Sequence, residues 1–235
     1  MKVTNPPPDN PLLSLTVNIL LPVMILNKGG HYLTPQLTLL VALCFPLIYG
    51  AQDWIRRRHK NYVSLLGLVN IMITGSLALG GLNGIWFAFK EAVLPSILGF
   101  LVLGSAWTKS PAAKLLFCNP HVLNMSLIEE RLLATARELD FQRILRQTTL
   151  WLSLSFFISA GANFTLGLRI FEAIDSHLSP EEQMKILNGQ LAHMTWMAFA
   201  MVALPLMLFS GILIYLFLKR VSALIEVPVD ALMKS

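Results

Sequence analysis

The segment QTTLWLSLSFFISAGANFTLGL, residues 147–168, lies between Arg146 and Arg169 and contains no charged side chain. As a helix it would be about 33 Å long, enough to cross the ~30 Å hydrocarbon core of a bilayer. Only 13% of the chain is charged, against about 25% in soluble domains. Six such uncharged segments hold 143 of the 235 residues: 10–27, 29–52, 61–89, 92–108, 147–168 and 186–218. The composition therefore excludes a water-soluble globule and predicts an all-α, polytopic membrane protein.

The segments predict about six transmembrane helices in a single membrane domain over residues 1–235. The fourth is extended outward across Lys90 and Glu91, because its uncharged part, 92–108, would give only about 25 Å of helix. The first is kept as a retained helix, because the N-terminus lacks the small-residue cleavage pattern of a signal peptide. The predicted spans are about 11–27, 34–52, 62–80, 86–107, 148–170 and 194–218.

The distribution of basic residues predicts the orientation. With both termini in the cytoplasm, fourteen of the eighteen Lys and Arg residues fall on the cytoplasmic side, as the positive-inside rule requires. The other side keeps Lys28, Lys90, Arg169 and Lys185. The net charge of +5 is therefore interpreted as attraction to membrane lipids, and nucleic acid is not expected as a partner.

The connection between the fourth and fifth spans is predicted to contain a cytoplasmic amphipathic helix over about 126–146. Ser126 and Glu129 have the spacing of a capping box, and leucine and isoleucine recur after them at helical intervals. One interpretation has this helix lie on the headgroup plane or pack beneath the bundle. The other has it dock a partner protein.

Charged and amide side chains at membrane depth are costly unless paired, so Lys90, Glu91 and Asn163 are the candidate functional polar residues. In one hypothesis Lys90 faces an anionic headgroup or a small anion. In the other it snorkels to the interface while Glu91 binds another helix, since neighbours on a helix point about 100° apart and need not pair. Asn163 suits either a hydrogen bond between helices or a ligand contact.

Other residue patterns give weaker indications. The basic run Arg56, Arg57 and Arg58 is a candidate contact for lipid headgroups, with a stop-transfer anchor as the plainer interpretation. Cys118 and His121 form half a zinc site with no second pair. No catalytic residue, cofactor site or metal site is predicted, because the chain has no recognisable hydrolase, nucleotide-binding or metalloprotease motif.

Three blocks resemble the intracellular septation protein A-like family of bacterial inner-membrane proteins. They are Trp86–Lys90 followed by Leu101–Ser105 and Lys109–Pro111, then Phe141–Leu145 leading through Trp151 to Gly161–Asn163, and the early segment Leu21–Leu26. Glu91 stands where a proline is expected, and the 112–140 segment is longer, which indicates a divergent member. The resemblance implies an inner-membrane envelope protein linked to septation, with protein partners and no enzymatic activity.

These observations predict a non-enzymatic septation-type or envelope protein that acts through contacts with membrane lipids and with other membrane or envelope proteins. The alternative is a small transporter or lipid-handling protein with Lys90 as an anion-binding residue in a polar cavity. That alternative requires Lys90 to be reachable by solvent.

Overall fold

The computed structural model describes residues 16–57, 62–120 and 122–234, and in these ranges the chain is mainly helical, without a β-strand. Four helical stretches of the described part are long and apolar enough to cross a membrane: Pro35–Gln52, Ile85–Ser105, Glu138–Ile170 and Pro180–Ile225. The predicted all-helical class and the fit to a multi-pass membrane protein are confirmed. The predicted number of six spans is not reached within the described residues.

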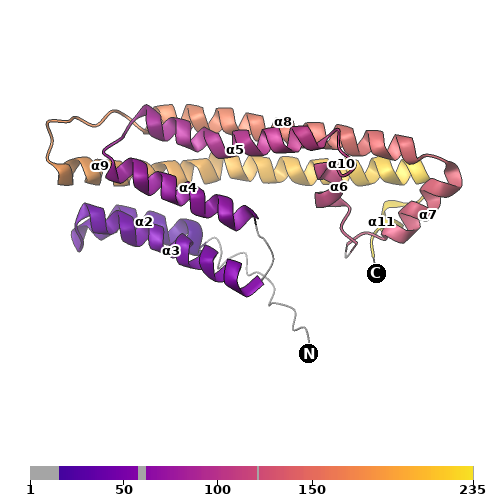
Figure 1. Ribbon diagram of the computed structural model, residues 1–235, viewed down its shortest axis with the longest axis horizontal. Coiled ribbons are helices and arrows are strands. Elements are labelled where there is room, and N and C mark those ends of the chain that lie inside the picture. Colours follow the sequence, from indigo (N-terminus) through magenta and orange to yellow (C-terminus); the bar gives the residue numbers. More distant parts are fainter. Residues whose placement is uncertain (1–15, 58–61, 121, 235) are drawn as a thin grey trace. The chain divides into compact units, whose positions relative to one another are not determined.

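The chain divides into two compact units, Met1–Leu94 with Ala162–Met201, and Pro95–Gly161 with Val202–Ser235. In unit 1 the described elements are η1 (Thr16–Leu20), α2 (Leu21–Lys28), η2 (Gly29–His31), α3 (Pro35–Arg57), α4 (Tyr62–Leu79), the start of α5 (Ile85–Ser105), the end of α8 (Glu138–Ile170) and α9 (Pro180–Ala198). The antiparallel helices α2 and α3 lie side by side (Figure 1).

The core of unit 1 is apolar and draws on several of its helices. Its buried residues are Leu39, Ala78, Phe87, Phe171, Leu187, Leu191 and Met194. The first predicted span, 11–27, is described only from Thr16 onward, and η1 with α2 gives about 20 Å of helix, short of a full crossing.

Two glycines bring α5 into place in unit 1. Gly84 precedes α5 with a φ of 58°, a left-handed conformation that glycine adopts without a Cβ clash. Gly167 on α8 lies against α5 so closely that a Cβ built there would be 2.7 Å from the Cα of Ala88. A side chain at position 167 would therefore push the two helix backbones apart.

Unit 2 contains the rest of α5 and α8, the short helices α6 (Ala112–Phe117), α7 (Met125–Thr135) and α11 (Val229–Leu232), and α10 (Leu204–Ile225). A π-helical turn, η3 (Phe199–Ala203), joins α9 to α10 without a break. Pro205 follows this turn and has no backbone N–H, so it cannot donate the α-helical hydrogen bond to the preceding turn.

The fifth and sixth predicted spans, 148–170 and 194–218, are parts of longer helices. The second of these starts at Pro180, so the predicted loop 169–193 is largely helical. Ser179 and Glu182 form a capping box there: the Ser179 hydroxyl accepts from the Glu182 N–H at 3.3 Å, and the Glu182 carboxylate accepts from the Ser179 N–H at 3.0 Å. The N-terminal N–H groups of α9 thus gain acceptors.

Residues 126–146 do not form the single amphipathic helix that the sequence predicts. Helix α7 is capped by Asn124, whose side-chain oxygen accepts from the Leu127 N–H at 3.2 Å, so Ser126 is not the N-cap. At Ala136 the chain turns through a left-handed conformation, φ 51°, and α8 begins two residues later. The turn brings both helices onto one hydrophobic core, which a straight helix would not do.

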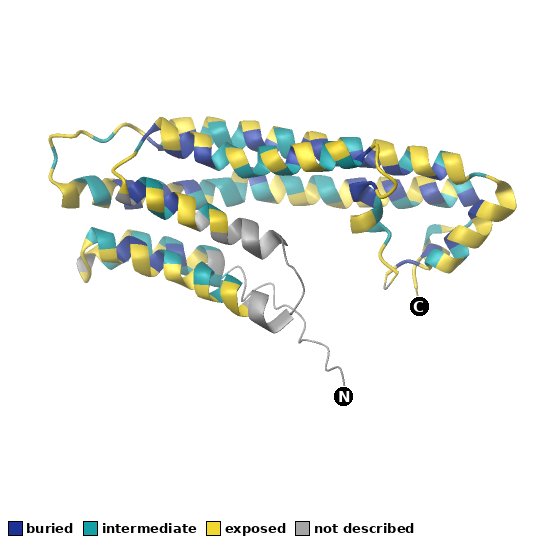
Figure 2. Ribbon diagram, in the orientation of Figure 1, coloured by how far each residue is buried: buried dark blue, intermediate teal, exposed yellow. Residues whose placement is uncertain are grey.

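That core lies at one end of unit 2, in what we call the end module, the described residues of 106–147 and 217–234. Its buried residues are Ala113, Leu123, Ile128, Leu132, Phe141, Leu145, Phe217, Val221, Ile225 and Leu232. Residues 229–234 belong to this core as well. The Asn124 N–H donates to the Leu232 carbonyl at 2.8 Å, and the Lys234 N–H donates to the Val122 carbonyl at 2.9 Å. Figure 2 shows exposed and buried residues alternating around these helices.

Substituting Gly167→Ala is expected to destabilise the protein by about 1–3 kcal/mol, because the new Cβ meets the backbone of Ala88 and neither helix can give way cheaply. The measurement is the thermal midpoint of the purified protein in detergent. Gly161→Ala on the same helix is the control, since a Cβ there meets nothing within 4 Å. Equal midpoints for the two variants would contradict the close approach.

Candidate functional site

Lys90 on α5 is buried and bound by two oxygens. Its ammonium group donates to the hydroxyl of Thr74 on α4 at 2.8 Å and lies 2.6 Å from the Glu91 carboxylate. The Thr74 hydroxyl in turn donates a hydrogen bond to the Asn70 carbonyl at 2.8 Å. The Lys90 and Glu91 side chains are only 6% and 20% exposed. The adjacent residues, which the sequence did not require to pair, therefore do pair.

This arrangement leaves the Lys90 charge compensated. An isolated cation at membrane depth costs several kcal/mol, and a carboxylate within contact distance removes most of that cost. The ammonium group already has a carboxylate and a hydroxyl as acceptors. It is therefore not the free, solvent-reachable cation that anion binding requires, and it joins α5 to α4 instead.

Asn163 lies half-buried on α8 in unit 1. The ring of its neighbour Phe164 packs against Phe89 with 5.1 Å between centroids. Because Phe89 directly precedes Lys90, this stacking puts Asn163 and the Lys90–Glu91 pair at the same level of α8 and α5. The three candidate polar residues thus belong to one part of unit 1.

The candidate headgroup contacts Arg56, Arg57 and Arg58 follow the apolar part of α3. Arg56 and Arg57 end that helix. Their side chains, and all of Arg58, lie outside the described residues. Their role as headgroup contacts stays a prediction.

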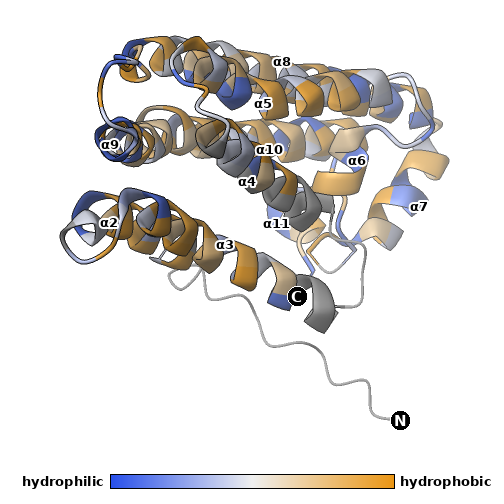
Figure 3. Cartoon of the chain, turned by 60° about the vertical axis from the view of Figure 1, so that its left-hand side comes forward, coloured by the Kyte–Doolittle hydropathy of each residue, from blue (hydrophilic) through white to orange (hydrophobic). Residues whose placement is uncertain are grey.

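A second candidate site lies where the uncharged helices of unit 2 meet the end module. The guanidinium carbon of Arg146 on α8 lies 4.9 Å above the Trp107 ring, which follows α5. Next to it, Arg220 of α10 donates to the side-chain oxygen of Gln147 at 2.8 Å. These contacts align the ends of three uncharged stretches, so we expect the membrane boundary of unit 2 at this level. In Figure 3, α5 and α10 are mainly hydrophobic, and α7 is mixed.

Helix α6 returns to the apolar side of this boundary. Its Ala113 N–H donates to the Thr149 hydroxyl at 3.1 Å. Ala112 packs in a cluster with Leu152 and Leu213, which lie deeper on α8 and α10. Leu115 on the same helix is exposed. We expect that face of α6 to contact lipid, since an apolar side chain at this depth faces acyl chains rather than water.

The corner between α7 and α8 is fixed by one arginine. Arg137 donates to the Leu224 carbonyl at the end of α10 at 2.7 Å, and its other nitrogen lies 3.5 Å from the Glu226 carboxylate. Leu133 and Leu139 on either side of this corner are exposed. These two leucines are therefore exposed next to the corner and are not part of the module's hydrophobic core.

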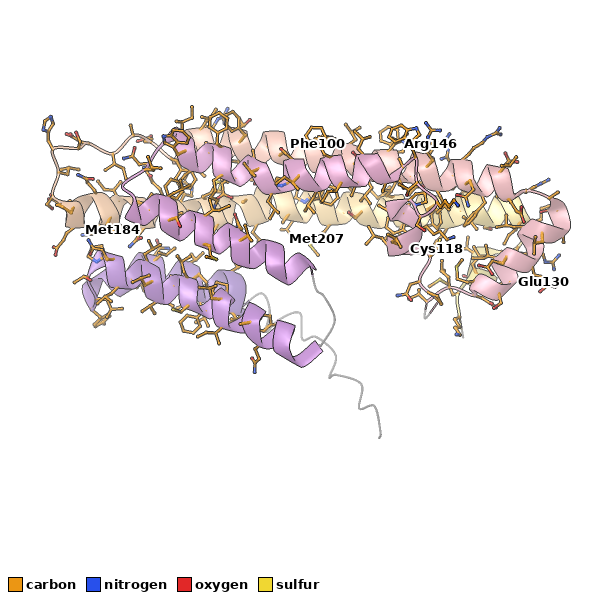
Figure 4. All side chains as sticks on the ribbon, in the orientation of Figure 1. Phe100, Cys118, Glu130, Arg146, Met184 and Met207 are labelled. Carbon is orange, nitrogen blue, oxygen red and sulfur yellow. The ribbon has the colours of Figure 1, made fainter. Side chains whose placement is uncertain are left out.

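Cys118, labelled in Figure 4, follows α6 and is partly buried. Burial raises the pKa of its thiol from 9.0 to about 11, and Lys114 opposes the shift only in part. The thiol is therefore protonated at neutral pH and a poor metal ligand. Within the described residues, no three His, Cys, Asp or Glu side chains are grouped to hold a metal, and His121 lies outside them.

Sequence reasoning missed three of these features. The first is the hydrogen bond from Lys90 to Thr74. Thr74 stands out in the sequence only as a hydroxyl residue in an apolar helix, and no sequence pattern pairs it with Lys90. The stacking of Arg146 on Trp107 had a visible signal, since each residue borders an uncharged stretch. Ser179, Pro180 and Glu182 carry a capping-box pattern with proline at the first helical position, which the predicted loop obscured.

Breaking the buried pair from one side is expected to be costly. Lys90→Met should destabilise the protein by about 2 kcal/mol or more, because it leaves the Glu91 carboxylate buried and uncompensated. The double variant Lys90→Met with Glu91→Leu should recover most of this loss. Thermal midpoints in detergent measure both. Arg143→Ala is the control, because it breaks an exposed pair with Asp140 that contributes less than about 1 kcal/mol.

The depth of α6 can be measured by thiol accessibility, with Cys44 and Cys118 replaced. Leu115 and Leu133 have nearly equal exposed fractions, 71% and 68%. Leu133→Cys should react with a membrane-impermeant maleimide about tenfold faster than Leu115→Cys in opened membranes, since lipid shields the latter and disfavours its thiolate. Equal rates would show that α6 lies in water.

Comparisons with known proteins give no family for the chain: no family model, no curated protein and no solved structure matches it. Its function has therefore to be inferred from its own residues. Those residues are a charge-compensated pair in unit 1 and, in unit 2, a packed module that begins at the membrane boundary.

Proposed function

We propose that this chain is a non-enzymatic protein of the bacterial inner membrane, a divergent member of the septation protein A-like family, that acts through contacts of its end module with other envelope proteins and with lipids. The proposal includes six transmembrane helices with both termini in the cytoplasm. The end module would then lie on the cytoplasmic side.

The observation that carries this proposal is the end module itself. It has its own hydrophobic core, assembled from two segments far apart in the sequence, and it extends beyond the uncharged stretches of α5, α8 and α10. A body of this kind is not needed to hold helices in a bilayer. Its exposed leucines at the Arg137 corner, Leu133 and Leu139, offer a protein partner apolar contacts surrounded by charge.

The charge of the end module supports the cytoplasmic orientation. It contains six acidic residues and nine basic ones, which are Lys109, Lys114, Arg131, Arg137, Arg143, Arg146, Lys219, Arg220 and Lys234. An excess of basic residues next to spanning helices favours the cytoplasmic side. The same excess favours contact with the anionic lipids of that leaflet.

The non-enzymatic part of the proposal rests on how the buried charges are used. Lys90 and Glu91 are the ionisable residues at membrane depth in α5, and each neutralises the other. A general acid, base or nucleophile needs access to a substrate, which their burial in this pairing does not offer.

A transporter or lipid-handling protein is the alternative, and the burial of a charged pair inside an apolar helix favours it, because such pairs often mark ion or substrate paths. It requires Lys90 to separate from Glu91 during a transport cycle. A stable Lys90→Met/Glu91→Leu variant would then lose solute flux, whereas the leading proposal expects cells carrying it to septate normally.

Site-specific photo-crosslinking in cells tests the leading proposal. A crosslinker at Leu133 or Leu139 should give a discrete adduct with an envelope protein, and a fluorescent fusion should gather at the division septum. Met207 is the control, since it is as exposed as Leu133, at 66%, but lies on the uncharged helix α10 and should contact only lipid. Uniform fluorescence around the cell, with no protein adduct at either leucine, would refute the proposal.

A further inference from the structure

Arg146 is held at the membrane boundary in an unusual way for a basic residue of the end module. Its guanidinium group stacks on the exposed ring of Trp107 at 4.9 Å. Nearby arginines are bound to oxygen atoms instead: Arg143 to Asp140 at 2.9 Å and Arg220 to Gln147 at 2.8 Å. Within the described part of the chain, no carboxylate lies within ion-pair distance of Arg146.

Stacking on a ring fixes the guanidinium without using its donors. The guanidinium carbon lies over the indole ring, so the cation–π attraction holds the group while using none of its N–H donors. A planar fork of donors held in this way matches two oxygens of a phosphate. Arg146 thus keeps its donors available for a bidentate acceptor, and no carboxylate of the described residues takes that place.

The position of Arg146 decides which phosphate is available. It is the last charged residue before the uncharged stretch 147–168, and Trp107 lies two residues beyond the end of α5. Indole rings favour the headgroup level of a bilayer, where lipid phosphates lie. Lys109, exposed two residues beyond Trp107, adds a second positive charge.

Toward the membrane interior the same surface continues as an apolar track. Phe100 and Leu101 on α5 are exposed. The Phe100 ring packs edge-on against Phe157 of α8 at 5.0 Å, which keeps it in place. In Figure 4 Phe100 and Arg146 lie along the same outer edge of the α5–α8 pair. The acyl chain of a lipid whose phosphate lies at Arg146 would contact these exposed apolar side chains.

We propose that Arg146, Trp107 and Lys109 bind the phosphodiester headgroup of an anionic phospholipid, with its acyl chain along Phe100. A zwitterionic headgroup brings its own cation, which would compete with Arg146 and Lys109 for the phosphate. The site therefore favours a lipid such as phosphatidylglycerol over phosphatidylcholine. This inference deepens the lipid-contact part of the proposed function, on which it rests, and does not depend on the contacts of Leu133 and Leu139.

The test is native mass spectrometry of the purified full chain in a non-ionic detergent, titrated with phosphatidylglycerol or phosphatidylcholine. Phosphatidylglycerol should bind preferentially, and Arg146→Ala should weaken its binding about fivefold, the effect of one basic residue worth ~1 kcal/mol at the membrane surface. Trp107→Leu should also weaken it, because the guanidinium loses its support. Arg143→Ala on the same helix should bind as the unmodified protein does.

Three results would overturn the proposal: unchanged affinity in Arg146→Ala, an equal loss in Arg143→Ala, or equal binding of both lipids. A further arm titrates inorganic phosphate, and displacement of the lipid at low millimolar phosphate would show a site for the free anion instead. Monodisperse elution of each variant excludes misfolding as the cause. If the lipid proposal fails but the crosslink at Leu139 still forms, only the lipid site is wrong. If the crosslink also fails to form, the proposed function fails with it.

Discussion

Hydrocarbon offers no hydrogen-bond partner, so each polar group placed in an apolar helix has to find an acceptor or donor inside the protein. In this chain the partner is repeatedly another helix. Ser153 of α8 donates to the Gly99 carbonyl of α5 at 3.0 Å, and Asn188 of α9 donates to the Pro35 carbonyl of α3 at 2.9 Å. Lys90 donates to Thr74 of α4 in the same way. These few hydrogen bonds specify which helices pack together and in which register, which apolar contacts alone do not.

The membrane class of the fold followed from charge depletion, and the starts of α3, α4 and α5 were predicted to within one residue. Helix α5 begins at Ile85, next to the predicted residue 86. The residue before it, Gly84, has a positive φ, which interrupts the helical backbone between α4 and α5. The corner at Ala136 was not predictable. Alanine favours helix and resists φ > 0, so contacts beyond the local sequence explain the turn: the shared core of α7 and α8 and the bonds of Arg137.

The same distinction applies to the candidate sites. Lys90, Glu91 and Asn163 could be selected because polar residues are rare in apolar stretches, yet whether Lys90 is free or paired depends on Thr74 and on how a flexible side chain bends. Arg146 was hidden among many basic residues near the boundary. What sets it apart is stacking on Trp107, a contact between residues 39 positions apart that no local pattern announces.

The way residues 229–234 close the end module has a consequence for synthesis. Leu232 is fully buried in a core that also contains Ile128 and Leu132, and Lys234 bonds back to Val122. On the ribosome, α7 emerges about a hundred residues before these partners. The bundle helices can therefore insert while α7 still lacks part of its cover, and the module closes only when residues 229–234 have been synthesised. Nascent chains stalled before residue 229 would keep that apolar surface open to chaperones.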